Sequence, residues 1–256
     1  MIRIRSLLFY VLLALATVVF VVIGVVILPL NFPLRFRIMS RWAVFNFWTL
    51  KHLCGLDHRV EGLQNIPAGP AIILCKHQSA WETLALQIHF PTQVWILKRE
   101  LLWIPIYGWG LASMQPISIN RSSGMRALKQ IVNDGRARLD RGLWVVIFPE
   151  GTRTAPGERR KYQAGGALLA AKTGYPVVPV AHNAGSYWPK NSLDKWPGTI
   201  RMVIGPVIQP AGKSVEEITN KAEQWIETTV AGLGAGNRTE TLPCVISRQN
   251  MRKCRP

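Results

Sequence analysis

A histidine and a carboxylate that could act together, His77 and Glu82, are separated by four residues. An imidazole can accept a proton from a hydroxyl, and a carboxylate on its other nitrogen would set the tautomer and stabilise the imidazolium. Such a spacing also arises often by chance, so a surface histidine near an unrelated acid remains an alternative for this motif alone. We therefore look for further motifs that would meet His77 and Glu82 in the fold.

A polar turn follows the strongest candidate strand, over residues 148–153. Its proline and glycine impose a sharp turn and let backbone amides approach an anion. Arg153 can hold a phosphate with two donors, and Glu150 would orient Arg153 or accept a hydrogen bond from a substrate hydroxyl. We take Glu150, Gly151, Thr152 and Arg153 as candidate substrate-binding residues, with a solvated polar turn as the alternative.

Another arginine, Arg121, follows a short apolar run over residues 117–119. One arginine after a strand is usually solvated. Two arginines at the same sheet edge as a histidine would indicate a phosphate site. Arg121 is therefore a further candidate for substrate binding.

Short apolar runs alternate with helical stretches from residue 59 onward. The expected strands cover residues 71–75, 93–97, 115–119, 143–148, 177–181 and 199–204. The expected helices cover residues 79–88 with Ser79 as N-cap, 122–141, 165–173, and 214–233 with a Ser214–Glu217 capping box. This alternation predicts an α/β fold with a mostly parallel sheet flanked by helices. His77 and both arginines would then lie at the carboxyl ends of strands, where sites form in such sheets.

The N-terminal segment is a candidate membrane anchor. Residues 6–30 carry no charge, and a bilayer core needs about 20 apolar residues. A cleaved signal peptide is disfavoured, because the run is long and lacks a small-x-small site before Asn31. A second helix over residues 35–53 mixes basic and aromatic side chains, a composition typical of the membrane interface. Two arrangements stay open: a spanning helix with the catalytic domain on the cytoplasmic side, or a hairpin dipping into one leaflet.

The composition limits the number of domains and the kinds of partner. The chain has 256 residues and a net charge of +17, which calls for anionic partners. No nucleic-acid-binding motif occurs, so an anionic membrane is favoured. The four cysteines form no C-x-x-C and suit neither a disulfide framework nor a metal site. We expect a membrane anchor over 1–54, a catalytic domain over 55–233, and a basic, disordered tail over 234–256.

The order of these motifs resembles the 1-acylglycerol-3-phosphate acyltransferases of the glycerolipid acyltransferase superfamily. The resemblance covers about residues 55–210 and rests on the segments 77–82, 117–121, 148–153 and 178–180, with Lys98–Leu101 and Ile104-Pro105 as further matches. It implies a glycerolipid acyltransferase-like fold in which His77 is the general base, Glu82 its partner, and the arginines bind phosphate.

The implied reaction moves a fatty acyl group from acyl-CoA or acyl-carrier protein to the sn-2 hydroxyl of 1-acylglycerol-3-phosphate, giving phosphatidic acid. It would need no metal or cofactor and would take place at a membrane, on the cytoplasmic side of a bacterial inner membrane. Alternatives are acylation of another lysolipid or amino-lipid acceptor, and a catalytically silent membrane-binding protein. A lipid esterase is disfavoured, because the chain has no G-x-S-x-G elbow.

Three positions depart from the family's usual residues. Glu82 and Asn120 stand where aspartate is common, and Gln163 stands where lysine is frequent. These departures bear on the acceptor headgroup more than on the chemistry. We expect the remaining histidines to be structural or solvated: His52, His58, His89 and His182.

Overall fold

The computed structural model describes residues 1–234, so the predicted tail lies, apart from its first residue, outside the described residues. The strands are β1 (Leu56–Glu61), β2 (Ile72–Cys75), β3 (Gln93–Lys98), β4 (Ile117–Ile119), β5 (Trp144–Ile147), β6 (Val177–His182) and β7 (Gly198–Ile204). The α-helices are α1 (Ile2–Val26), α2 (Phe32–Met39), α3 (Arg41–Cys54), α4 (Trp81–His89), α5 (Tyr107–Ser113), α6 (Met125–Leu139), α7 (Gly165–Thr173) and α8 (Val215–Leu233).

The strands form one sheet in the order β1-β7-β6-β2-β5-β3-β4. Neighbouring strands run parallel except β6 and β7, which pair antiparallel. The prediction of a mostly parallel sheet flanked by helices is therefore confirmed. β2 lies inside the sheet between β6 and β5, and all four of its residues are buried. The chain segment that follows β2 thus begins at the middle of the sheet's carboxyl edge.

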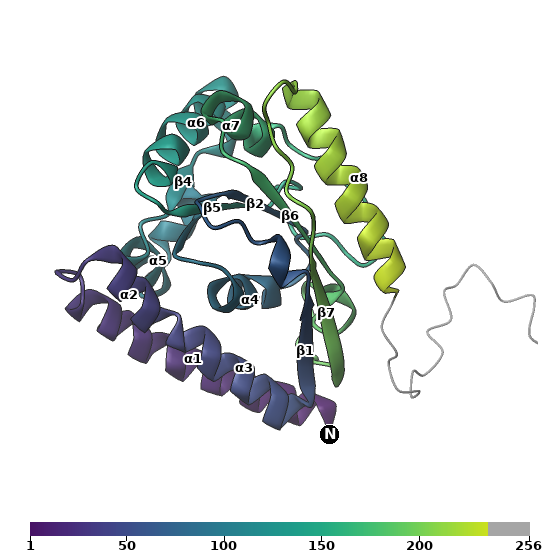
Figure 1. Ribbon diagram of the computed structural model, residues 1–256. Coiled ribbons are helices and arrows are strands. Elements are labelled where there is room, and N and C mark those ends of the chain that lie inside the picture. The colour runs from purple at the N-terminus through teal and green to yellow at the C-terminus, as the bar shows by residue number, and fades with distance from the viewer. Residues whose placement is uncertain (235–256) are drawn as a thin grey trace, which may run out of the picture.

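Helices cover both faces of the sheet (Figure 1), with α6, α7 and α8 on one face and α4, α3 and α1 on the other. Successive side chains of a strand point to opposite faces. In β2, Ile72 and Leu74 accordingly join one buried cluster, and Ile73 and Cys75 join the other. A strand buried on both faces holds the residues after it in place from two sides.

The N-terminal helices form a hairpin-like pair. The indole of Trp42 donates to the hydroxyl of Thr17 at 3.2 Å, and the thiol of Cys54 contacts the carbonyl of Arg5 at 3.9 Å. These contacts set α1 and α3 side by side in opposite directions (Figure 1). The single second helix predicted over 35–53 is wrong, because the chain forms two helices separated at Ser40. The hydroxyl of Ser40 donates to the carbonyl of Phe36 at 2.8 Å, a back-bond that bends helices.

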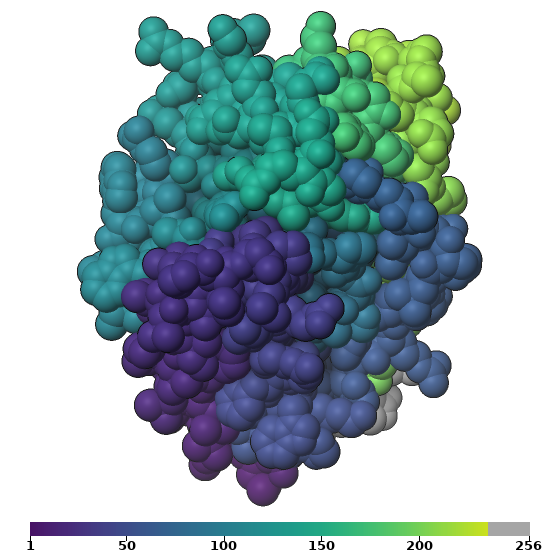
Figure 2. Space-filling model, turned by 60° about the vertical axis from the view of Figure 1, so that its left-hand side comes forward, coloured from purple at the N-terminus to yellow at the C-terminus, as the bar shows by residue number. Residues whose placement is uncertain are grey.

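α1 is long and apolar enough to cross a membrane, with a mean hydropathy of 2.9 and 17% of its most apolar stretch buried. A signal sequence near the N-terminus would satisfy the same test. The helix nevertheless packs on the rest of the chain at both ends. Phe9 is fully buried and meets Trp188 edge-on, while a methyl group on Gly110 of α5 would come within 2.8 Å of Val21. In Figure 2 the N-terminal helices, in purple, accordingly lie directly against the later part of the chain.

Two elements were absent from the sequence prediction, β1 and α5. The predicted start of α4 is also wrong, since the helix begins at Trp81 with Ala80 as N-cap rather than at Ser79. The backbone N–H of Ser79 instead donates to the carboxylate of Glu82, at 2.9 Å to Oε1 and 3.1 Å to Oε2. The acid in the first turn of α4 therefore reaches back toward the loop after β2.

Candidate active site

His77 lies two residues beyond the end of β2, and its ring stacks on Phe148, which follows the neighbouring strand β5. The two ring centroids are 4.0 Å apart and the rings are tilted by only 15°. The side chain of His77 is 16% exposed. Two adjacent parallel strands therefore deliver the histidine and the turn over 148–153 to the same sheet edge, as the sequence predicted.

Glu82 meets His77 as expected. Its Oε1 lies 2.7 Å from Nδ1 of His77, and the same oxygen accepts the backbone N–H of Gln78 at 3.0 Å. Burial by itself raises the pKa of Glu82, but His182, His77 and the N–H of Ser79 outweigh it, so the pKa lies below its ordinary value. An ionised Glu82 accepts a hydrogen bond from Nδ1–H, which leaves Nε2 of His77 as the nitrogen available to accept a proton.

His182 lies behind this pair, at the end of β6 next to β2. Its Nε2 is 3.8 Å from Oε2 of Glu82 and 2.8 Å from the carbonyl of Lys76, while Nδ1 accepts the N–H of Ala184 at 3.2 Å. Burial lowers the pKa of His182, and the charge of Glu82 opposes that shift. His182 is fully buried rather than solvated, and its contact with Glu82 was not predicted. Its place at the end of a strand next to β2 was the available signal.

In the turn over residues 148–153, the carboxylate of Glu150 points into the protein interior. The side chain of Glu150 is fully buried, with Oε1 2.5 Å from Nζ of Lys76 and Oε2 accepting the N–H of His77 at 2.7 Å. Gly151 follows with a φ of +70°, which a glycine adopts without strain. Glu150 was expected beside Arg153 or at the substrate. The structure places it in the interior instead, because a buried ammonium lies on that side.

Arg121 contacts the turn over residues 148–153, since its guanidinium Nη1 donates to the carbonyl of Gly151. It begins a 3-10 turn that Asn120 caps, by accepting the N–H of Ser122 at 3.1 Å. Asparagine therefore serves as a cap at the position where aspartate is common. The link to Gly151 brings Arg121 to the edge that holds His77.

Arg153 immediately precedes Thr154, whose N–H donates to the carbonyl of His77 at 2.8 Å. Burial raises the pKa of Tyr107 in α5, and the positive charge of Arg153 opposes that rise. Thr152 and Arg153 are both half-buried. The predicted site residues thus lie at one edge of the sheet, with the carboxylates of Glu82 and Glu150 buried. Among residues 1–234, no three His, Cys, Asp or Glu side chains cluster in a way that would hold a metal ion.

Comparison with known proteins agrees with this geometry. A model of the Acyltransferase family matches residues 57–183. A 1-acyl-sn-glycerol-3-phosphate acyltransferase of Pseudomonas aeruginosa is 44% identical over 233 residues, which span 89% of this chain and 91% of that protein. The chain belongs to the 1-acyl-sn-glycerol-3-phosphate acyltransferase family.

Two further relatives are more distant in sequence. The chloroplastic relative LPAT1 of Arabidopsis thaliana is 31% identical over 65% of this chain and 47% of its own length. The crystal structure of the 1-acyl-sn-glycerophosphate acyltransferase PlsC from Thermotoga maritima superposes with a TM-score of 0.76. It covers 94% of this chain and 97% of its own, at 24% identity, and so supports the fold. The resemblance inferred from the motifs is confirmed, and the chain is an acyltransferase.

Proposed function

We propose that this acyltransferase moves a fatty acyl group from an acyl thioester to the sn-2 hydroxyl of 1-acylglycerol-3-phosphate, giving phosphatidic acid. The observation that carries the proposal is the 2.7 Å contact between Nδ1 of His77 and Oε1 of Glu82, which leaves Nε2 to act as base. The activity named for the P. aeruginosa relative supports the choice of acceptor.

The proposed chemistry needs only a positioned base. Nε2 of His77 takes the proton of the acceptor hydroxyl as its oxygen attacks the thioester carbonyl carbon. Glu82 stabilises the imidazolium that forms. When the tetrahedral intermediate collapses, the carbon–sulfur bond breaks and the imidazolium returns its proton to the leaving thiolate. The acyl group passes directly to the acceptor, with no covalent bond to the protein.

The acceptor phosphate would be held by Arg121 and Arg153, with the backbone of Gly151 and Thr152 beside them. Arginine is suited to this role because its planar guanidinium offers paired donors to phosphate oxygens. The donor would be acyl-CoA or acyl-carrier protein. Another lysolipid or an amino-lipid is the second candidate acceptor. The reason is Gln163, which stands where the family often has lysine. Gln163 lies near the turn, since a Cβ atom added to Gly151 would be 3.9 Å from its Cγ atom.

The reaction would take place at a membrane surface. Along α1, exposed apolar side chains include Val11, Leu15, Val18, Val19 and Val22, and α1 packs on α5. Trp103 and Trp109, 65% and 60% exposed, lie just before and within α5, and tryptophan favours the membrane interface. The packing of α1 along the protein supports a one-sided hairpin over an isolated spanning helix. The excess of basic residues supports an anionic cytoplasmic leaflet, here that of a bacterial inner membrane.

Replacing the base tests the mechanism directly. His77→Ala should lower turnover by roughly 10² to 10⁴ at unchanged folded fraction, because general-base catalysis is lost. His52→Ala, at an exposed histidine of α3, is the matched control and should keep wild-type turnover. Near-normal turnover by a folded His77→Ala protein would rule out the proposed base.

The acceptor is tested by mass spectrometry of products from a panel of lysolipids and amino-lipids, each offered with acyl-CoA and with acyl-carrier protein. We expect phosphatidic acid from 1-acylglycerol-3-phosphate to be the dominant product. Faster acylation of a different acceptor would overturn the acceptor assignment and leave the role of His77 intact.

A further inference from the structure

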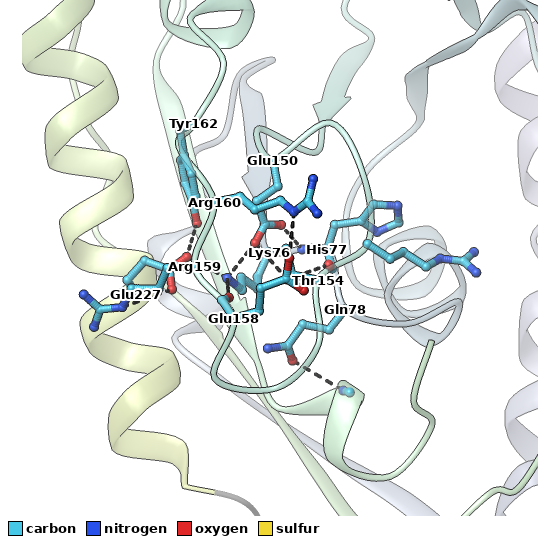
Figure 3. Close-up of polar contacts among 12 residues, drawn as sticks. Lys76, His77, Gln78, Glu150, Thr154, Glu158, Arg159, Arg160, Tyr162 and Glu227 are labelled. Carbon is cyan, nitrogen blue, oxygen red and sulfur yellow. Dashed lines mark hydrogen bonds and ion pairs between the residues drawn. The ribbon is translucent and has the colours of Figure 1, made fainter. Parts of the chain in front are cut away.

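A buried group of charges lies behind the histidine, around the side chain of Lys76 (Figure 3). This residue directly precedes His77 and its side chain is 1% exposed. Its Nζ lies 2.5 Å from Oε1 of Glu150, 2.7 Å from Oε1 of Glu227 on α8, and 3.5 Å from the carbonyl of Glu158. An ammonium has three donors, so these three acceptors satisfy it completely.

The group combines one buried cation with two buried carboxylates. Tyr162 donates to Oε1 of Glu227 at 2.9 Å, and Nε of Arg159 lies 3.9 Å from its Oε2. Taking such charges out of water is expensive, and apolar side chains of similar volume usually serve stability as well or better. Stability alone is therefore a poor explanation for the group.

Glu150 and Thr154 connect this group of charges to the backbone of His77 by hydrogen bonds. Oε2 of Glu150 accepts the N–H of His77 at 2.7 Å, and Thr154 donates both to Oε1 of Glu150, at 3.1 Å, and to the carbonyl of His77. Both peptide groups of His77 are thus bonded, while Glu82 holds its ring. The bond to the N–H is charge-assisted only if Glu150 is ionised.

The ionisation of Glu150 depends on Lys76. Burial raises the pKa of Glu150, and the ammonium of Lys76 opposes that rise by its charge and its hydrogen bond. Without Lys76, two buried carboxylates would face each other and the protonated form of Glu150 would be favoured further. Glu227, 151 residues further along the chain, holds the ammonium in place.

We propose that Lys76 is a positioning residue for the acyl transfer: it holds the carboxylate of Glu150 against the backbone N–H of His77, and Glu227 of α8 holds Lys76. The inference rests on the proposed role of His77 as base. It couples α8 to the loop that carries His77.

The variant Lys76→Met keeps the length of the side chain and removes its charge. At neutral pH we expect kcat to fall about ten- to a hundredfold, because a small displacement of a catalytic group has effects of that size. The KM for the lysolipid acceptor should change little. The loss should shrink as pH rises, because a carboxyl group with a raised pKa is protonated below that pKa and ionised above it. The acid limb of the kcat profile should therefore move to higher pH.

Lys221→Met, at an exposed lysine of α8, is the control for loss of a positive charge and should match the wild type. If Lys76→Met does not fold, the double variant Lys76→Met/Glu227→Gln removes the cation together with one of the two carboxylates, and it should show the same pH shift. A folded variant with wild-type kcat would overturn the inference, as would a loss of equal size at every pH. The His77→Ala result is independent of these outcomes, so failure of the base assignment can be told apart from failure of this inference.

Discussion

The candidate active site has two halves, His77 with Glu82 and Arg121 with Arg153, and they differ in how tightly their side chains are packed. On the histidine side, Glu82 is fully buried, and the ring of His77 is confined between that carboxylate and Phe148. On the arginine side, Arg121 is exposed and donates to a carbonyl, while Arg153 is half-buried. A base must be oriented before the substrate arrives, whereas a phosphate-binding group can find its charged partner in the substrate itself. The difference indicates which substitutions should affect turnover and which should affect substrate affinity.

Among these predictions, the largest loss of specific activity is expected in the His77–Glu82 half, from substitution of Glu82. Glu82→Gln should lower specific activity by about 10² or more, because an amide carries no charge and can donate to His77 and favour the wrong tautomer. Glu82→Asp should keep substantial activity, because a carboxylate remains. Activity should be measured per folded molecule over the same substrate range.

The control for this series is Glu216→Gln, an exposed acid in the first turn of α8. An acid that only favours a helix start contributes about 0.3 to 1 kcal/mol of stability and no catalysis. Glu216→Gln should therefore leave turnover unchanged. Wild-type specific activity in Glu82→Gln would remove Glu82 from the active site and weaken the contrast between the two halves.

An intermediate effect is expected on the arginine side. Arg153→Ala and Arg121→Ala should each raise the KM for the phosphorylated acceptor roughly ten- to a hundredfold, since each removes a charge-assisted contact of about 1.5 to 3 kcal/mol. Arg141→Ala, at an exposed arginine after α6, is the control. If both arginine variants lowered kcat at constant KM, the arginines would belong with the His77–Glu82 half.

The smallest effect on the chemistry is expected outside both halves, on the apolar face of α1. Val22→Asp places a charge at a side chain that is 59% exposed and should weaken sedimentation with anionic vesicles. Turnover of detergent-dispersed substrate should stay within about twofold, because surface substitutions away from the site change little. Asn220→Asp on α8 makes the same change of charge at an exposed position and should bind vesicles normally. Unchanged vesicle binding by Val22→Asp would show that this face does not contact the membrane.

The sequence predicts a membrane anchor over residues 1–54, but deleting these residues would be a poor test of membrane contact. Phe9, Leu50 and Cys54 belong to the same buried cluster as the strand residues Ile73 and Val146. Removing the N-terminal helices would therefore expose a face of the sheet, and aggregation would mask any change in membrane binding. The N-terminal helices and the sheet share a core that the sequence pattern did not reveal.

Elements with strong local signals were predicted well. The helix predicted over 165–173 matches α7, and the predicted capping box of α8 is present, with Ser214 and Glu217 each accepting the other's backbone N–H. β1 was missed because half of its residues are charged and only its first is buried. Its pairing with β7 at the edge of the sheet is a long-range contact that no local pattern encodes.

The meeting of the site residues at one edge of the sheet could be predicted, because it follows from the order of strands and helices along the chain. Strands of a parallel sheet end at the same edge, so His77 after β2 and the turn after β5 had to meet. Glu82 lies in the first turn of the next helix, and the chain between is too short to separate it from the histidine. For these residues, local structure and strand order were sufficient.

The direction of each side chain was decided by the tertiary structure. Glu150 could have faced Arg153 within its own turn, but it faces a lysine 74 positions earlier in the chain, because a buried carboxylate requires a buried cation. Glu227 completes that contact from a helix 151 residues away from Lys76. The sequence by itself determined which groups stand at the edge of the sheet. Only the packing of distant segments decided which of them are buried and which contact the backbone of the histidine, because burial and pairing of charge depend on neighbours that the local sequence does not specify.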